Sequence, residues 1–240
     1  MTAILAALLF AHPFAPIRDA NSIRHALEQR YQRAATLKAV FFERFTDGNG
    51  GIVAESGTVY FSRPGRMRWE YESPEEKLFL VDGTNVWFYV PSDHTASRAK
   101  FKESSDWRTP LALLAGKADL GKFCRSVSID DASAANAKPD DRPTDPGNTV
   151  LRCLPRGPAD SAAGGAAGDA DAGTIKEVLF EASPDAHLVR VLIREPGNLE
   201  TEFRFGAWQE NITIPETKFH FVAPPGVEIV DEAKLSGEIH

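Results

Sequence analysis

The sequence predicts an α+β fold in which two helices cover one face of a large, curved antiparallel sheet. Short segments of alternating apolar and polar residues, separated by Gly, Pro and Asp turns, recur along most of the chain. Only two segments carry the signals of a helix start. The chain has 240 residues, 42% of them apolar, which is enough for a sizeable core. We therefore expect a single domain over residues 19–240.

The N-terminal stretch MTAILAALLFAHPFAP predicts export. Its apolar run from Ala3 to Ala11 is shorter than the about 20 residues that span a bilayer, but it suits the core of a secretory signal. We expect a signal peptide over residues 1–15, cleaved after Ala11 or Ala15. No Lys or Arg precedes the apolar run, which a truncated start would explain, and a buried helix end is the alternative interpretation. The expected product is soluble and lies in the periplasm or outside the cell.

The segment DANSIRHALEQRYQRAATLKAV predicts the first helix. Asp19, Asn21 or Ser22 can cap its N-terminus. The residues that follow recur at helical spacing and form one mostly apolar face, which comprises Ile23, Ala26, Leu27, Arg30, Tyr31, Ala34 and Leu37. A helix with such a face packs against a sheet or another helix.

The next segments alternate between strands and turns. Turn signals lie at residues 47–51, which are Gly-rich, at the Arg-Pro-Gly corner of residues 63–65, and at the Asp-Gly pair of residues 82–83. In the strand RMRWEYE, apolar and charged residues alternate, so that Met67 and Trp69 share one face. HLVRVLIRE and TEFRF show the same alternation. The pattern predicts an antiparallel sheet of ten or eleven strands with one apolar and one solvated face.

The segment SSDWRTPLALLAGKADLGKF predicts the second helix. Thr109 can cap it, Pro110 suits the first helical position, and Gly116 can end a short apolar turn. Farther along, two segments rich in Ala, Gly, Pro and Asp surround one short strand. We expect them to be flexible insertions within the sheet, near residues 131–148 and 156–173.

Cys124 and Cys153 are the only cysteines of the chain. They lie in GKFCRSVSI and NTVLRCLP, which are expected to be consecutive strands, and neighbouring antiparallel strands can bring two sulfurs within bonding distance. A disulfide would suit an oxidising compartment. The alternative is two separate buried thiols, because a free Cys packs as a small apolar residue.

Composition and motifs give no support for catalysis or nucleic-acid binding. The net charge of −7 lacks the clustered excess of Lys and Arg that phosphate binding requires. The sequence contains no nucleophile elbow, helical zinc motif, phosphate loop or dinucleotide fingerprint. Ser92, Asp93 and His94 are adjacent, but catalytic triads are assembled from distant segments, so we interpret them as a solvated turn. We expect no catalytic residues, no cofactor and no metal.

The apolar face of the predicted sheet is the candidate binding site. Two helices on so large a sheet can leave apolar volume unfilled, which suits a lipid ligand. Plain core packing is the competing interpretation, because aromatic residues in strands are often core residues. The candidate lipid-binding residues are Phe41, Phe45, Phe61, Met67, Trp69, Phe79, Trp87, Val191 and Phe203.

The order of four segments resembles the periplasmic outer-membrane lipoprotein carrier family, LolA. These segments are LKAVFFERF, GTVYFSRPGRMRWEYESPEEKLFLVDGTNVWFYVP, TPLALLAG and the terminal KFHFVAPPGVEIVD. The resemblance implies an open, incomplete antiparallel β-barrel with a helical lid over an apolar concave face. It also implies a monomeric, non-enzymatic carrier that binds the acyl chains of lipoproteins and shuttles them from the inner to the outer membrane. The implied partners are acylated lipoproteins, an inner-membrane ABC-type lipoprotein-releasing complex and, if the organism has one, an outer-membrane lipoprotein receptor.

The resemblance also assigns a role to Arg63, which falls on the arginine that ties down the lid in the empty form of the family. A guanidinium has five donors and can hold several carbonyls at once. Two features depart from the family pattern, namely Met67 in place of Phe and the long Ala- and Gly-rich insertions. A general lipid or glycolipid shuttle and a lipid-sensing regulatory protein on the same fold are the alternative functions.

Overall fold

The computed structural model describes residues 19–101, 113–114, 119–130, 138–156 and 175–231. The predicted signal peptide and most of the predicted second helix lie outside the described residues, as do the first half of one predicted insertion and nearly all of the other. Among the described residues, no helix is long and apolar enough to cross a membrane.

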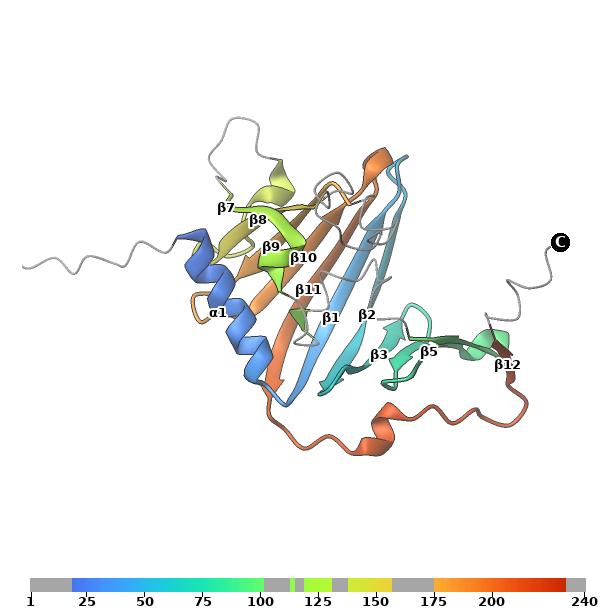
Figure 1. Cartoon of the computed structure of the whole chain (residues 1–240). Coiled ribbons are helices and arrows are strands. Elements are labelled where there is room, and N and C mark those ends of the chain that lie inside the picture. The colour runs from blue at the N-terminus through green and yellow to red at the C-terminus, as the bar shows by residue number, and fades with distance from the viewer. Residues whose placement is uncertain (1–18, 102–112, 115–118, 131–137, 157–174, 232–240) are drawn as a thin grey trace, which may run out of the picture.

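One twisted sheet of twelve strands dominates the described chain (Figure 1). The strand order is β12-β6-β5-β4-β3-β2-β1-β11-β10-β9-β8-β7, and the two end strands are not paired with each other. The sheet is therefore an open, incomplete barrel, as predicted. The strands are β1 (Thr36–Thr46), β2 (Ile52–Ser62), β3 (Arg66–Ser73), β4 (Lys77–Val81), β5 (Asn85–Val90), β6 (Thr95–Lys100), β7 (Cys124–Ile129), β8 (Thr149–Pro155), β9 (Glu177–Ala182), β10 (Leu188–Arg194), β11 (Glu200–Glu210) and β12 (Glu228–Asp231).

Neighbouring strands are antiparallel with one exception. The last strand, β12, pairs in parallel with β6, which the sequence did not predict. A parallel partner must arrive by a long connection, because a tight turn can join only antiparallel strands. The chain makes this connection through residues 211–227, which pass along the outside of the sheet from β11 to β12 (Figure 1).

Helix α1 (Ala20–Arg33) lies across one face of the sheet, beside β7 to β10 (Figure 1). Asp19, one of the three predicted caps, accepts a hydrogen bond of 2.9 Å from the backbone N–H of Ser22. A second, one-turn helix, α2 (Leu120–Phe123), leads directly into β7. Short 3-10 helices occur at η1 (Pro91–Asp93), η3 (Pro139–Asp141), η5 (Pro196–Asn198) and η6 (Glu216–Phe219).

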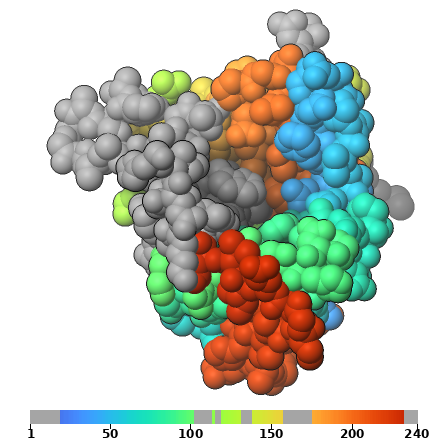
Figure 2. All heavy atoms as spheres, turned by 90° about the vertical axis from the view of Figure 1, so that its right-hand side faces the viewer, coloured from blue at the N-terminus to red at the C-terminus, as the bar shows by residue number. Residues whose placement is uncertain are grey.

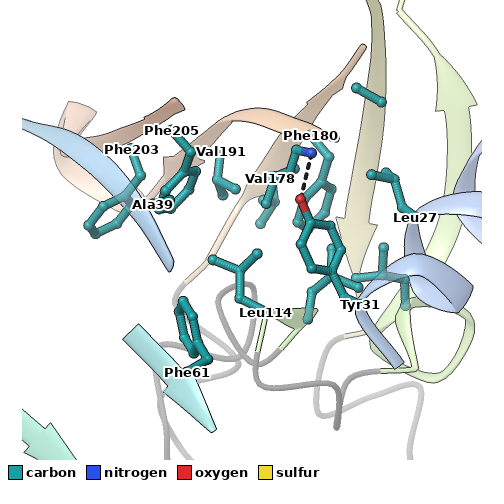
Figure 3. Packing of buried hydrophobic residues seen from close by; sticks show 14 of the residues in the cluster. Leu27, Tyr31, Ala39, Phe61, Leu114, Val178, Phe180, Val191, Phe203 and Phe205 are labelled. Atoms are coloured by element: carbon teal, nitrogen blue, oxygen red, sulfur yellow. Dashed lines mark hydrogen bonds between the residues drawn. The ribbon is translucent and has the colours of Figure 1, made fainter. Parts of the chain in front are cut away.

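Strand parity decides which side chains face α1. In β1, Leu37, Ala39 and Phe41 are buried on the side of α1, and the residues between them point the other way. The corresponding positions of β2, β3 and β8 to β11 continue this face, so that one apolar cluster runs across the sheet beneath the helix (Figure 3). We call this side of the sheet the concave face and the opposite side the convex face.

The C-terminal segment covers part of the convex face. Phe219 of η6 is fully buried against Leu78 and Leu80 in a second, separate apolar cluster. Lys218 donates from Nζ to Glu70 over 2.8 Å, and Arg68 donates to the carbonyl of Lys218 over 3.0 Å. Figure 2 shows the C-terminal segment, in red and orange-red, lying against the green strands β5 and β6.

Charged residues form a network on the rest of the convex face. Arg190 of β10 is 2% exposed, and its Nε lies 2.9 Å from Oε2 of the buried Glu181. Its Nη1 and Nη2 donate to the backbone carbonyls of Asp140 and Arg142, over 2.7 and 2.8 Å. Residues 138–148, the second half of a predicted flexible insertion, are therefore held against the sheet. The division of the chain into a signal segment and one domain remains a prediction.

Candidate functional site

The concave face is a continuous apolar wall closed by α1. Leu27 and Tyr31 of the helix are fully buried against the sheet, and Leu114 projects into the space between Phe61 and Val178 (Figure 3). None of the described members of the cluster is more than 8% exposed. The centre of the described concave face is therefore covered, and access to this centre requires movement of the elements above it.

Aromatic rings lie at the centre of this wall. The ring of Trp69 contacts that of Phe41 at 4.8 Å between centroids, with the planes 69° apart. Phe203 and Phe61 approach the same indole at 5.6 and 6.1 Å, also edge to face. Such edge-to-face contacts fix the orientation of the rings, and the rings together form a large apolar surface.

The structure brings most of the predicted lipid-binding residues together on the concave face. The following six are buried members of the one cluster: Phe41, Phe61, Met67, Trp69, Val191 and Phe203. Phe79, opposite Trp69 in the register, packs at the border of the cluster, and Phe45 is half-buried on the same face of β1. Contact of these residues with lipid stays a prediction.

Trp87 was wrongly predicted to line this face. It pairs with Leu80 in the β4–β5 hairpin and belongs to the convex cluster, where its ring stacks on Phe221 at 4.8 Å. The register of the hairpin explains the error, because Val86 and not Trp87 contacts the concave cluster. Asp82 holds this arrangement by accepting from Nε1 of Trp87 over 2.9 Å.

Several apolar side chains at the border of the concave face are not covered. Val53 of β2, which lies opposite Phe45, is 54% exposed. Phe88 of β5, which lies opposite Phe79, is 43% exposed. Together these four residues extend the apolar wall beyond its buried centre and leave it accessible there.

Polar side chains interrupt the concave wall at Glu43, Glu55 and Lys77, and sequence reasoning missed them. Glu43 of β1 accepts a hydrogen bond of 2.8 Å from the hydroxyl of Tyr71, and burial raises the pKa of its carboxyl. Glu55 and Lys77 form an ion pair beside it. The sequence did contain a signal, because Glu43 has the same strand parity as Phe41 and Phe45 in FFERF.

Arg63 contacts the helix that covers the wall. Its Nε donates to the carbonyl of Ala34, the C-terminal cap of α1, and its backbone N–H donates to the carbonyl of Ala35 over 3.1 Å. Burial lowers the pKa of its guanidinium. The guanidinium thus donates to the carbonyl of the residue that caps α1, and a role of Arg63 in lid movement stays a prediction.

A buried carboxylate connects α1 to the segment beside it. Glu28 is 6% exposed, and its Oε1 accepts from the backbone N–H of Leu120 over 2.8 Å at the start of α2. Arg24 donates to the same carboxylate over 2.9 Å. Directly after α2, Cys124 forms a disulfide with Cys153 of β8. Strand β7, at the edge of the sheet, is thereby attached both to its neighbour and to the helix above it.

Comparisons with known proteins agree with this architecture. The family model described as outer membrane lipoprotein carrier protein LolA matches residues 32–141. The outer-membrane lipoprotein carrier protein of Nitrosospira multiformis is 26% identical over 213 residues, which cover 86% of this chain and 87% of that protein. The protein of the same name from Nitrosomonas europaea is 24% identical over 231 residues, which cover 96% of this chain and 99% of that protein. Over this region the chain is similar to the LolA family.

A solved structure shows the same fold at low sequence identity. An uncharacterized conserved protein from Thermus thermophilus superposes with a TM-score of 0.51 and 9% identity, covering 88% of this chain and 98% of that protein. This likeness concerns the fold alone. The region that matches the LolA family model holds β1 to β6, Arg63 and most of the aromatic wall.

Proposed function

We propose that this chain is a non-enzymatic periplasmic carrier that binds the acyl chains of lipoproteins on its concave face. The single observation that carries the proposal is the wide apolar wall, whose centre is covered among the described residues by α1 and Leu114. A protein that needed this surface only for its own core would have no use for the uncovered border at Val53 and Phe88. Acyl chains are flexible and apolar, and a wall of aromatic and aliphatic side chains suits them.

The shuttle from the inner to the outer membrane completes the proposal. The related carriers are named for outer-membrane lipoproteins, which supports cargo of this class. An inner-membrane ABC-type complex would supply the lipoprotein, and an outer-membrane receptor would accept it. A hydrophobic surface that can be covered and uncovered allows the carrier to travel through water between the two membranes.

A pair of variants on one strand tests whether the concave face binds lipid. Phe45 and Phe42 both lie on β1, but Phe45 faces the concave side and Phe42 the convex side. We expect Phe45→Glu to weaken binding of an environment-sensitive fluorescent fatty acid about tenfold or more, because a charge replaces apolar contact area. Phe42→Glu should bind as the wild type does. Equal binding by the two variants would contradict the proposed site.

The cargo class requires a separate measurement. Lipid extracted from protein purified without detergent should contain acylated peptides when analysed by mass spectrometry. Recovery of free glycolipids alone would instead favour the general lipid shuttle. Saturable fatty-acid binding together with acylated peptides would support the carrier role. If the protein is folded and delipidated but gives neither result, the carrier role is overturned.

A further inference from the structure

Arg30, on the flank of α1, holds the helix to the far side of the sheet. Its Nε lies 2.6 Å from Oε1 of Glu210, at the end of β11. Its Nη1 donates to the carbonyl of Asp185, in the β9–β10 turn, over 2.8 Å, and its Nη2 lies 2.5 Å from Nε2 of His187. One side chain of the helix thus reaches three groups on two separate parts of the sheet.

His187 extends the receiving site of Arg30. Its Nδ1 lies 2.7 Å from Oδ2 of Asp185, and its Nε2 lies 3.4 Å from Oε1 of Glu210. The carboxylate of Glu210 and the carbonyl of Asp185 accept from the guanidinium of Arg30, which can only donate.

The receiving surface is built by the sheet itself. Ser183 and His187 close the β9–β10 turn through a backbone hydrogen bond of 2.9 Å, and the hydroxyl of Ser183 donates to Asp185 over 2.6 Å. The next helix residue, Tyr31, is fully buried and accepts from the backbone N–H of Leu188 over 2.8 Å (Figure 3). The turn thus presents preformed acceptors, and α1 places Arg30 onto them.

The position of Arg30 differs from that of Arg63 in its relation to the hinge. Helix α1 passes into β1 through Ala34 and Ala35 alone, so the helix can leave the sheet only by rotating about these two residues. Arg63 contacts the carbonyls of these same residues. Arg30 lies one helical turn away, about 6 Å along the axis, and grips the body of the helix. Rotation must separate Arg30 from its acceptors on the sheet, and it must also move the carbonyls of Ala34 and Ala35 relative to Arg63.

We propose that Arg30 is a positioning residue that forms a second latch of the lid, with Glu210, His187 and the Asp185 carbonyl as its receiving site. This inference rests on the proposed function insofar as opening of α1 admits cargo. The Arg30 latch resists the rotation from the body of the helix, and the Arg63 contact resists it at the hinge. The two residues then contribute independently to the closed state.

Arg33 offers a matched control on the same helix. It is exposed, and its side-chain contact, 3.3 Å from Nη2 to Oε1 of Gln29, stays within α1. We expect Arg30→Gln to raise the amide hydrogen exchange of residues 20–33 about three- to tenfold in the ligand-free protein, because a partly exposed charged cluster is lost. Arg33→Gln should leave that exchange unchanged, and amides of β1 and β11 should exchange at the wild-type rate in both variants.

A second readout separates a latch from general support of the fold. If Arg30 holds the lid closed, Arg30→Gln increases the open fraction and raises the apparent affinity for the fluorescent fatty acid, whereas simple damage to the site would lower it. Arg30→Lys keeps a positive charge beside Glu210 but loses the planar guanidinium with its several donors. It should therefore have an intermediate effect on α1 exchange and on apparent affinity. In combination with Arg63→Leu, the exchange effects should multiply.

The outcomes of these measurements separate the latch from the carrier role. Faster α1 exchange in Arg30→Gln without fatty-acid binding by any variant would support the latch and overturn the proposed carrier function. Equal exchange in Arg30→Gln and Arg33→Gln would overturn the latch and leave the carrier function intact. If Arg30→Gln unfolds, Arg30→Lys replaces it in the test. The amides of α1 must then exchange faster in Arg30→Lys than in the wild type if the latch exists.

Discussion

At the scale of single residues, Glu43 shows how a polar group is held in an apolar wall. It lies next to Phe203 in the register of β1 and β11, on the concave face, and Tyr71 supplies its hydrogen bond. Burial disfavours the ionised carboxylate, and the hydrogen bond from the tyrosine offsets only part of that cost. The carboxyl therefore binds a proton more tightly in the folded chain than in the unfolded chain.

Replacement of Glu43 should change stability in a pH-dependent way. Below about pH 4 both states are protonated at this residue, so burial costs little. As the pH rises, the unfolded chain loses its proton first, and the folded state loses stability until its own raised pKa is passed. We expect Glu43→Gln to stabilise the protein at pH 7.5, by about 1 kcal/mol, and to have little effect near pH 4.

Thermal unfolding at the two pH values measures this difference. Glu76→Gln, at an exposed position, removes the same charge without the burial and should show no such pH dependence. A stabilisation of Glu43→Gln that is equal at both pH values would contradict a raised pKa for Glu43.

The residues also show what the sequence could predict about the site. The inward parity of Phe41, Phe61 and Trp69 followed from simple alternation, because no bulge intervenes in the paired segments that hold them. The prediction for Trp87 was wrong because Trp87 pairs with Leu80, which faces the convex side, and the register of a hairpin depends on its turn. Arg30 was placed on a mostly apolar face, but its partners lie about 150 to 180 residues away, which no local pattern can reveal.

At the scale of elements, residues 138–148 form a structured part of the convex face. Composition predicted a flexible insertion, since Asp, Pro and Ala are common in such segments. Buried charges outweigh that tendency here. Asp141 is 5% exposed, and its Oδ1 lies 2.7 Å from Nη2 of Arg194, while Arg190 holds two backbone carbonyls of the same segment. The interaction is between remote segments and becomes visible only in the folded sheet.

Removal of Arg190 should destabilise the protein strongly. Arg190→Leu would leave the buried carboxylates of Glu181 and Glu202 without their common cation, at a cost of about 3 to 5 kcal/mol. Arg204 of β11 also pairs with Glu202, over 3.0 Å, but its side chain is 49% exposed. We expect Arg204→Leu to cost less than about 1 kcal/mol. Urea unfolding midpoints at constant slope would measure the loss of unfolding free energy in both variants. Similar losses in the two would contradict the strong stabilisation expected from the buried network of Arg190.

At the scale of the whole molecule, alternation predicted the antiparallel sheet and the family resemblance implied its open form, but neither predicted how the last strand joins the sheet. Alternation predicts which face is apolar, while the parallel pairing of β12 with β6 depends on a connection around the outside of the sheet. The closed arrangement joins α1 to β2 through Arg63, to β9–β11 through Arg30 and to α2 through Glu28. Several separate contacts thus join α1 to the rest of the described fold.

This arrangement predicts that Arg63 couples lid closure to cargo transfer. If closure of α1 competes with cargo for the concave wall, part of the cargo's binding energy is spent on opening, and a receptor of higher affinity can then remove the cargo. Arg63→Leu keeps the bulk but removes every donor to Ala34, so the empty protein should shift toward open forms. Apparent affinity for a labelled lipoprotein should then rise, because a larger fraction of the protein is competent to bind. Release of the lipoprotein to the receptor should slow in proportion to the rise in affinity.

Arg66→Leu is the matched control, because Arg66 pairs with Ser62 and Glu216 instead of the helix, and it should load and release as the wild type does. Loading and transfer of the same labelled lipoprotein measure both steps, and a folded Arg63→Leu protein that transfers at the wild-type rate would show that Arg63 serves only the structure of the hinge.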